Sequence, residues 1–211
     1  IKGVNKMWAY IKDGAIKQTN TVQTRLEINP GSYFPAKYAN EWTKEQKEAY
    51  GVYEVVVDKT NYKDENYYIN TDSTYTFSGG VVKETWGTAT ARKLGDTNWT
   101  QEEIDAGKAP SGADTNTVAK VGLTNQHKNE ISYTAHGLLS PTDWYASRKA
   151  EAGTAIPSAV ATYRAAVRTK AADMHTKIDA ADTVDKLAAL YVYNTDNPPV
   201  RPLGEWPDPV E

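Results

Sequence analysis

Three histidines are the first candidates for chemistry in this chain, because histidine titrates near neutral pH and is a common metal ligand. They are His127, His136 and His175. His127 and His136 are nine positions apart, whereas two ligands on one helix face need a spacing of three or four. The sequence also has no His-Glu-x-x-His arrangement. We therefore expect surface or half-buried histidines that bind no metal.

Nucleophilic and paired-carboxylate catalysis have equally little support. The sequence contains no cysteine, which excludes disulfide scaffolds, thiolate metal sites and thiol nucleophiles. It has neither the Gly-x-Ser-x-Gly elbow nor the Gly-x-x-x-x-Gly-Lys-Ser phosphate loop. The carboxylate pairs 64–65 and 102–103 are adjacent in sequence, so their side chains point apart and do not form a facing acid and nucleophile. We expect a protein that is not an enzyme and that binds no cofactor.

Composition narrows the possible partners. The 211 residues include 24 Lys and Arg against 27 Asp and Glu, which gives a formal net charge of −3. This balance gives no electrostatic reason to expect nucleic acid as a partner. No apolar stretch is long enough to span a membrane. The 14 Tyr and 6 Trp against 2 Phe suit half-buried surfaces or surfaces shared with a partner, because both side chains combine an apolar body with a polar tip.

The first half of the chain has the pattern of a β-rich domain. Asp13-Gly14 and Ser78-Gly79-Gly80 each separate two short β-prone runs, which predicts two tight hairpins. The runs 25–28 and 52–57 predict further strands. Met7 stands directly before the first strand pattern, so we expect residues 1–6 to be an upstream extension.

Two short helices in this half are predicted by capping boxes. In each, a Thr is followed three residues later by Gln or Glu, as in Thr43 with Gln46 and Thr100 with Glu103. Gly51 is expected to end the first helix in a left-handed conformation.

The second half is rich in alanine and has helical periodicity. Residues 118–139 predict one helix, which the Ser-Pro-Thr-Asp sequence at 140–143 ends while opening the next. Pro157 opens the strongest helix, and its apolar residues recur at steps of three and four. This stripe packs either inside the chain's own bundle or against another chain, and the first is the simpler interpretation. Its members are Val160, Tyr163, Val167, Ala171, Met174 and Ile178.

These patterns predict an α+β fold in four parts. We expect a β-rich domain with hairpins over residues 1–106 and a Pro- and Gly-containing linker over 107–116. A helical hairpin or bundle domain is expected over 117–194. The tail 195–211 contains five prolines, so it should be extended, either loose or laid over a neighbour.

The tyrosines of the β-rich half have three possible uses. They could stack sugars, pack the sheet, or form a contact with another subunit, and packing or contact is the more frequent use of aromatic strand residues. The tyrosines concerned are Tyr33, Tyr38, Tyr50, Tyr53, Tyr62, Tyr67, Tyr68 and Tyr75.

The helical half also contains an ordered motif in which Thr-Asp-Trp is followed by Arg, Gly, Pro, Tyr-Arg and a second Arg. This motif resembles the tail-fibre assembly chaperone family of tailed bacteriophages and related phage tail and virion proteins. The resemblance covers residues 138–190, about a quarter of the chain, and residues 7–14 more loosely resemble the start of phage structural proteins. The motif positions are Thr142, Asp143, Trp144, Arg148, Gly153, Pro157, Tyr163, Arg164 and Arg168.

Each motif side chain also has a physical interpretation. Asp143 can cap a helix N-terminus, and Trp144 can anchor its helix on the next one. Arg148 can pair with the glutamate three residues later. Arg164 and Arg168 are four residues apart on one helix face and could clamp a carboxylate of a neighbouring protein.

The resemblance implies a non-enzymatic structural component of a tailed phage particle, associated with the tail or a tail fibre. Its motif residues would dock other phage virion proteins, or further copies of the same chain. It would be found in the virion, and in the host bacterial cytoplasm during assembly. One alternative is the assembly chaperone itself; another is a receptor- or glycan-binding virion module that uses the tyrosines. The elaborate β-rich half departs from the chaperone pattern and favours a part built into the particle.

Overall fold

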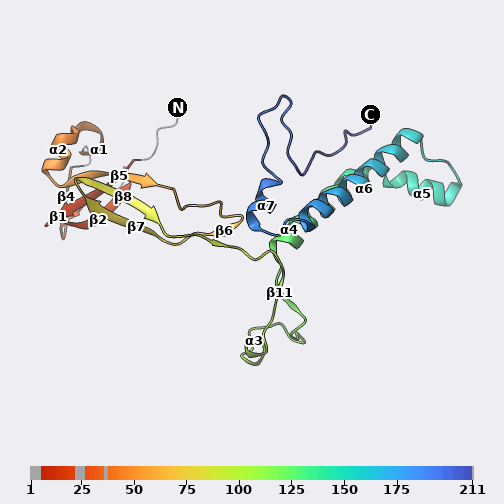
Figure 1. The fold of residues 1–211 in the computed structure, drawn as a ribbon, viewed down its shortest axis with the longest axis horizontal. Helices are drawn as coiled ribbons and strands as arrows, with labels where there is room; N and C mark the ends of the chain where they lie inside the picture. The colour runs from red at the N-terminus through yellow and green to blue at the C-terminus, as the bar shows by residue number, and fades with distance from the viewer. Residues whose placement is uncertain (1–5, 22–26, 36–37, 211) are drawn as a thin grey trace. The chain divides into compact units, whose positions relative to one another are not determined.

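The computed structural model describes residues 6–21, 27–35 and 38–210 (Figure 1). Strands fill most of the N-terminal half and helices dominate the C-terminal half, which confirms the predicted α+β class. Residues 1–5, most of the expected upstream extension, lie outside the described residues, as do the first two residues of the run 25–28. The chain divides into two compact units, Ile1–Thr90 and Ala91–Glu211.

A five-stranded sheet forms the body of the first unit. Its strand order is β2-β1-β5-β8-β7. All neighbouring pairs are antiparallel except β5 and β8, which run parallel. Both predicted hairpins are present, and their turn residues have positive φ: 56° and 73° at Asp13 and Gly14, 57° and 75° at Gly79 and Gly80. The strands are β1 (Met7–Lys12), β2 (Ala15–Thr21), β5 (Val52–Asp58), β7 (Ser73–Ser78) and β8 (Val81–Trp86).

Strand β1 is buried on both faces. Trp8 and Tyr10 point into an aromatic cluster with Phe34, Tyr38 and Val52. The alternate residues of β1 point to the other face of the sheet and form a smaller aliphatic cluster. That second cluster consists of Ala9, Ile11, Val55 and Val82.

Short elements around the sheet complete the first unit. They are β3 (Glu27–Asn29), β4 (Ser32–Tyr33), α1 (Tyr38–Glu41), α2 (Lys44–Ala49) and β6 (Tyr68–Ile69). Both halves of the predicted capping box of α2 are formed. Gly51 follows with φ 75°, as predicted. Its carbonyl accepts a 2.7 Å hydrogen bond from the Ile11 amide, so the end of α2 is fixed to β1.

The chain passes between the units at β9 (Thr90–Ala91). In the second unit β10 (Thr97–Asn98) pairs with β11 (Val118–Lys120), and α3 (Gln101–Asp105) lies between them in sequence. Residues 107–116, expected to form a linker, lie in the loop between α3 and β11. The paired strands hold both ends of this loop, and the compact units divide after residue 90. The division into four parts that the sequence suggests stays a prediction, because it concerns which parts of the chain fold separately.

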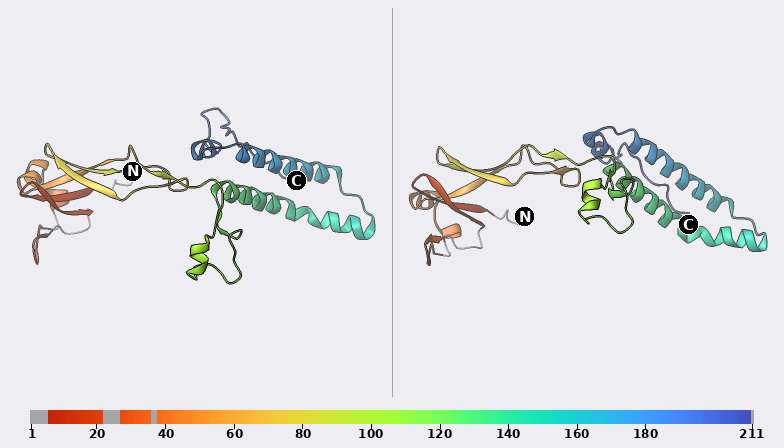
Figure 2. Two further views of the ribbon diagram at one scale, coloured as in Figure 1. Left: turned by 60° about the horizontal axis from the view of Figure 1, so that its bottom comes forward. Right: turned by 90° about the horizontal axis from the view of Figure 1, so that it is seen from below.

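The long helices α4 (Leu123–Leu139) and α6 (Ser158–Asp179) lie side by side in the second unit (Figure 2). The helix expected over 118–139 starts five residues late, because β11 takes its first residues. The apolar stripe predicted on α6 is buried against the chain's own residues: Val167, Met174 and Ile178 are 0% exposed. The helices are α4 (Leu123–Leu139), α5 (Asp143–Ala152), α6 (Ser158–Asp179) and α7 (Val184–Ala189), with a 3₁₀ turn η1 (Ser140–Thr142) before α5.

The start of α4 is held by a residue distant in sequence. Asp96 accepts hydrogen bonds from the Gly122 amide (2.7 Å) and from the Asn125 side chain (2.9 Å). A Cβ on Gly122 would lie 2.2 Å from the Leu94 carbonyl oxygen. Only glycine therefore fits at this N-cap.

The Pro-rich tail is laid over the chain's own helices. Leu203 is 1% exposed, and its amide donates to the Leu190 carbonyl at 2.9 Å. Trp206 and Val210 pack against the cluster of Ala135, Tyr163 and Val167. Among the described residues, no helix is both long and apolar enough to cross a membrane.

Candidate interaction surface

Four of the predicted motif residues meet at the corner where α4 turns into α5. The Arg164 guanidinium donates to the Leu139 carbonyl (2.9 Å), to Thr142 Oγ1 (2.6 Å) and to Asp143 Oδ1 (2.8 Å). The Tyr163 hydroxyl lies 3.5 Å from the Leu138 carbonyl. These contacts, the Arg164 knot, join residues 21 to 25 positions apart and fix α6 to the corner.

The Arg164 knot corrects two expectations. Asp143 is the first residue of α5 and not its N-cap, which is Thr142, and the Asp143 carboxylate is paired with Arg164. Arg164, whose side chain is 9% exposed, is likewise occupied within the chain and cannot clamp a neighbour's carboxylate. Arg168 is exposed, and its guanidinium lies 3.5 Å from the Arg164 carbonyl on its own helix.

The glycine and proline of the motif shape the turn between α5 and α6. Gly153 has φ 69° and ends α5, with its amide bonded to the Lys149 carbonyl at 3.1 Å. Pro157 stands immediately before α6, and its carbonyl accepts the first helical hydrogen bond, from Ala161. These two residues place α6 so that Arg164 reaches the corner.

The tryptophan of the motif does not anchor α5 as expected. Trp144 is 51% exposed. Its ring stacks on Tyr145 with 3.8 Å between centroids, and the Arg148 guanidinium lies 4.7 Å from the Trp144 centroid and 5.3 Å from that of Tyr145. Arg148 therefore covers these rings instead of pairing with Glu151. We call Trp144, Tyr145 and Arg148 the α5 cluster.

Trp144→Ala should change the free energy of unfolding by less than about 1 kcal/mol, because a half-exposed side chain loses little packing on truncation. Denaturant unfolding followed by circular dichroism measures this effect. A loss of about 3 kcal/mol or more would be typical of a buried aromatic and would show that the indole is a core anchor after all.

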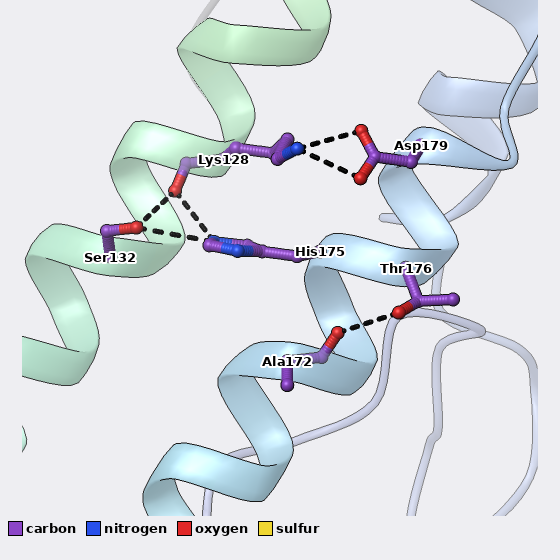
Figure 3. Close-up of polar contacts among 6 residues, drawn as sticks. All are labelled: Lys128, Ser132, Ala172, His175, Thr176 and Asp179. Carbon is purple, nitrogen blue, oxygen red and sulfur yellow. Dashed lines mark hydrogen bonds and ion pairs between the residues drawn. The ribbon is translucent and has the colours of Figure 1, made fainter.

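The seam between α4 and α6 holds a polar network that sequence spacing did not reveal (Figure 3). Lys128 Nζ binds both carboxylate oxygens of Asp179 at 2.9 Å. His175 Nε2 lies 3.0 Å from the Lys128 carbonyl and 3.3 Å from Ser132 Oγ, and Ser132 Oγ donates to the same carbonyl at 3.0 Å.

The hydrogen bonds around Ser132 and His175 require the tautomer of His175 that does not suit a base for a serine nucleophile. A carbonyl oxygen only accepts hydrogen bonds, so His175 Nε2 must carry the proton to bond with Lys128. A protonated Nε2 cannot take the proton of Ser132. The network therefore stabilises the packing of α4 against α6. Separately, no cluster of metal-ligating side chains occurs in the described part of the chain.

The side chain of His127 is largely enclosed, with 14% of its surface exposed. Its ring lies 4.8 Å from that of Tyr191, and Nδ1 lies 3.5 Å from a Glu130 carboxylate oxygen. Burial lowers the pKa of His127 below its usual value, and the nearby Glu130 partly opposes this. The folded protein thus favours the neutral ring.

Lowering the pH from 7 to 5.5 should therefore decrease the free energy of unfolding. The unfolded chain takes up a proton at the ordinary histidine pKa of about 6.5, whereas the folded chain resists it, so stability is lost below that pH. Urea unfolding at several pH values measures the effect, and His127→Gln should make the dependence shallower. An identical pH dependence in wild type and H127Q would contradict the assignment.

The tyrosines of the β-rich half do not form one exposed platform. Tyr38 is 1% exposed, and Tyr67 and Tyr68 are 9% exposed, whereas Tyr33 and Tyr50 are 48% and 61% exposed. Trp8, Tyr10 and Tyr38 are core residues, so the Tyr and Trp excess serves the fold of this unit as well as its surface.

No protein-family model matches the chain, and no curated protein or solved structure is significantly similar to it.

Proposed function

We propose that this chain is a non-enzymatic structural component of a tailed bacteriophage particle, associated with the tail or a tail fibre. It acts through protein–protein contacts made by the α5 cluster. The observation that carries the proposal is that some residues of the phage-like motif bind within the chain while others lie on its surface. Arg164 binds Thr142 and Asp143, while Trp144 of the same motif is exposed with Arg148 over its ring.

The composition of the α5 cluster supports a contact role. Trp, Tyr and Arg are the residues most enriched at the energetic centres of protein interfaces. The three side chains already stack on one another on a single helix, so little side-chain entropy is left to lose on binding. The Arg164 knot fixes the start of α5 and keeps the cluster in one orientation.

Mass spectrometry of purified particles tests the location. We expect the chain to stay with particles through density-gradient purification, and we expect Trp144→Ala to reduce its amount in them without unfolding it. Tyr133→Ala is the matched control and should leave the amount of the chain in particles unchanged. Tyr133 is also a surface aromatic, 82% exposed, but it lies on α4 and outside the α5 cluster. Absence of the chain from infected cells and particles alike would overturn the proposal.

The assembly chaperone is the second candidate. The observation that favours it is that the whole resembling segment, 138–190, lies inside the compact unit Ala91–Glu211. A chaperone would be present in infected cells, would bind newly made fibre protein, and would be missing from mature particles. That pattern in the particle experiment would replace the structural role by the chaperone role.

A further inference from the structure

We infer that the α5 cluster binds an aspartate or glutamate side chain that a partner protein presents next to an apolar side chain. This inference rests on the proposed function, since it names the chemistry of the partner that the same cluster would contact.

The Arg148 guanidinium is held in place on the surface without a carboxylate partner among the described residues. Its Cζ lies over the rings of Trp144 and Tyr145, and its Nε is enclosed without a hydrogen-bond partner. Among residues 6–21, 27–35 and 38–210, the structure gives this guanidinium no carboxylate partner. Arg164, by contrast, has three oxygen acceptors. Arg148 is therefore a positioned cation whose charge is available to another molecule.

A carboxylate fits this cation. A guanidinium that lies on aromatic rings has lost water from one face and keeps in-plane N–H donors that match the two oxygens of a carboxylate. Such charge-assisted hydrogen bonds are among the stronger polar contacts in proteins. The exposed half of Trp144 offers an apolar surface beside them. Together these groups select a carboxylate with an apolar neighbour.

The mixed charges around the α5 cluster do not suit a polyanion as the preferred partner. Helix α5 carries Arg148 and Lys149, but also Asp143 and Glu151. Binding to a nucleic acid backbone requires several cations without compensating acids, and the whole chain has a net charge of −3. A single carboxylate on a protein surface suits this balance better than a chain of phosphates.

The test selects linear peptides that bind the full chain from a random library, with counter-selection on the Trp144→Ala variant. We expect selected peptides to contain Asp or Glu beside an apolar residue. Glu→Gln in the peptide and Arg148→Gln in the protein should each weaken binding roughly tenfold or more. The two changes together should weaken it little further, because both remove the same ion pair.

Lys149→Gln is the matched control, because Lys149 is the adjacent exposed cation and should alter binding less than about twofold. Peptides that need Trp144 but tolerate both Glu→Gln and Arg148→Gln would overturn the carboxylate assignment and leave the contact role standing. A library without any Trp144-dependent peptide would overturn the inference, whereas the particle experiment judges the proposed function separately. Binding of a labelled single-stranded oligonucleotide that Arg148→Gln abolishes would also overturn it.

Discussion

Arg164→Met should lower the free energy of unfolding of the chain by about 2–4 kcal/mol. Methionine keeps the unbranched apolar stem of the side chain but lacks the guanidinium, so it removes the three hydrogen bonds that Arg164 donates. The Leu139 carbonyl and Thr142 hydroxyl then lose a buried donor. Because Asp143 is 52% exposed on its side chain, water can solvate its carboxylate, and we expect a smaller loss than for a fully buried ion pair. Denaturant unfolding at pH 7 measures the change.

Arg168→Met provides the matched control. Arg168 lies one turn further along the same helix and is exposed, so the same chemical change there should alter the free energy of unfolding by less than about 0.5 kcal/mol. Equal effects of R164M and R168M would contradict the knot. Arg164→Met should also weaken the contacts of the α5 cluster, since the start of α5 would lose its attachment to α6.

The features that the sequence predicted correctly are local. The turn at Asp13-Gly14 and the capping box at Thr43 each depend on residues at most three positions apart. The buried stripe of α6 depends on one helix period. In these cases the chemistry that forms the structure is contained in a short stretch of chain, so pattern alone is sufficient.

The roles of the motif residues could be predicted only in part. The motif selected the residues that meet at the corner, yet it assigned Trp144 to the core and Arg164 to the surface, and the structure reverses both. Which face of α5 is buried depends on how α6 returns, and that contact joins residues 21 positions apart. The motif does not include Tyr145, although its position three residues before Arg148 on one helix is a usable signal for the contact between them.

Contacts over long sequence separations account for the other differences. Nothing near residue 118 indicates that residues 118–120 pair with β10 as a strand, or that Asp96, 26 positions before Gly122, binds the amide of that residue. The aromatic residues of the β-rich half are a similar case. Their apolar bodies and polar tips suit a partner's surface or a mixed core equally well. Strand alternation places Trp8 and Tyr10 on one face, but only the fold shows that Phe34 and Tyr38 cover that face.

Leu203→Ala tests the position of the tail and should lower the free energy of unfolding by about 2–4 kcal/mol, because a buried leucine truncated to alanine leaves a cavity. The side chain is 1% exposed, and the Leu203 amide donates to the carbonyl of Leu190, the C-cap residue of α7. Val200→Ala is the control three residues earlier. Val200 is 49% exposed, so its truncation should cost less than about 0.5 kcal/mol. If L203A were as stable as V200A, the tail would not be part of this core, and it would be available as an extended arm for a neighbouring subunit.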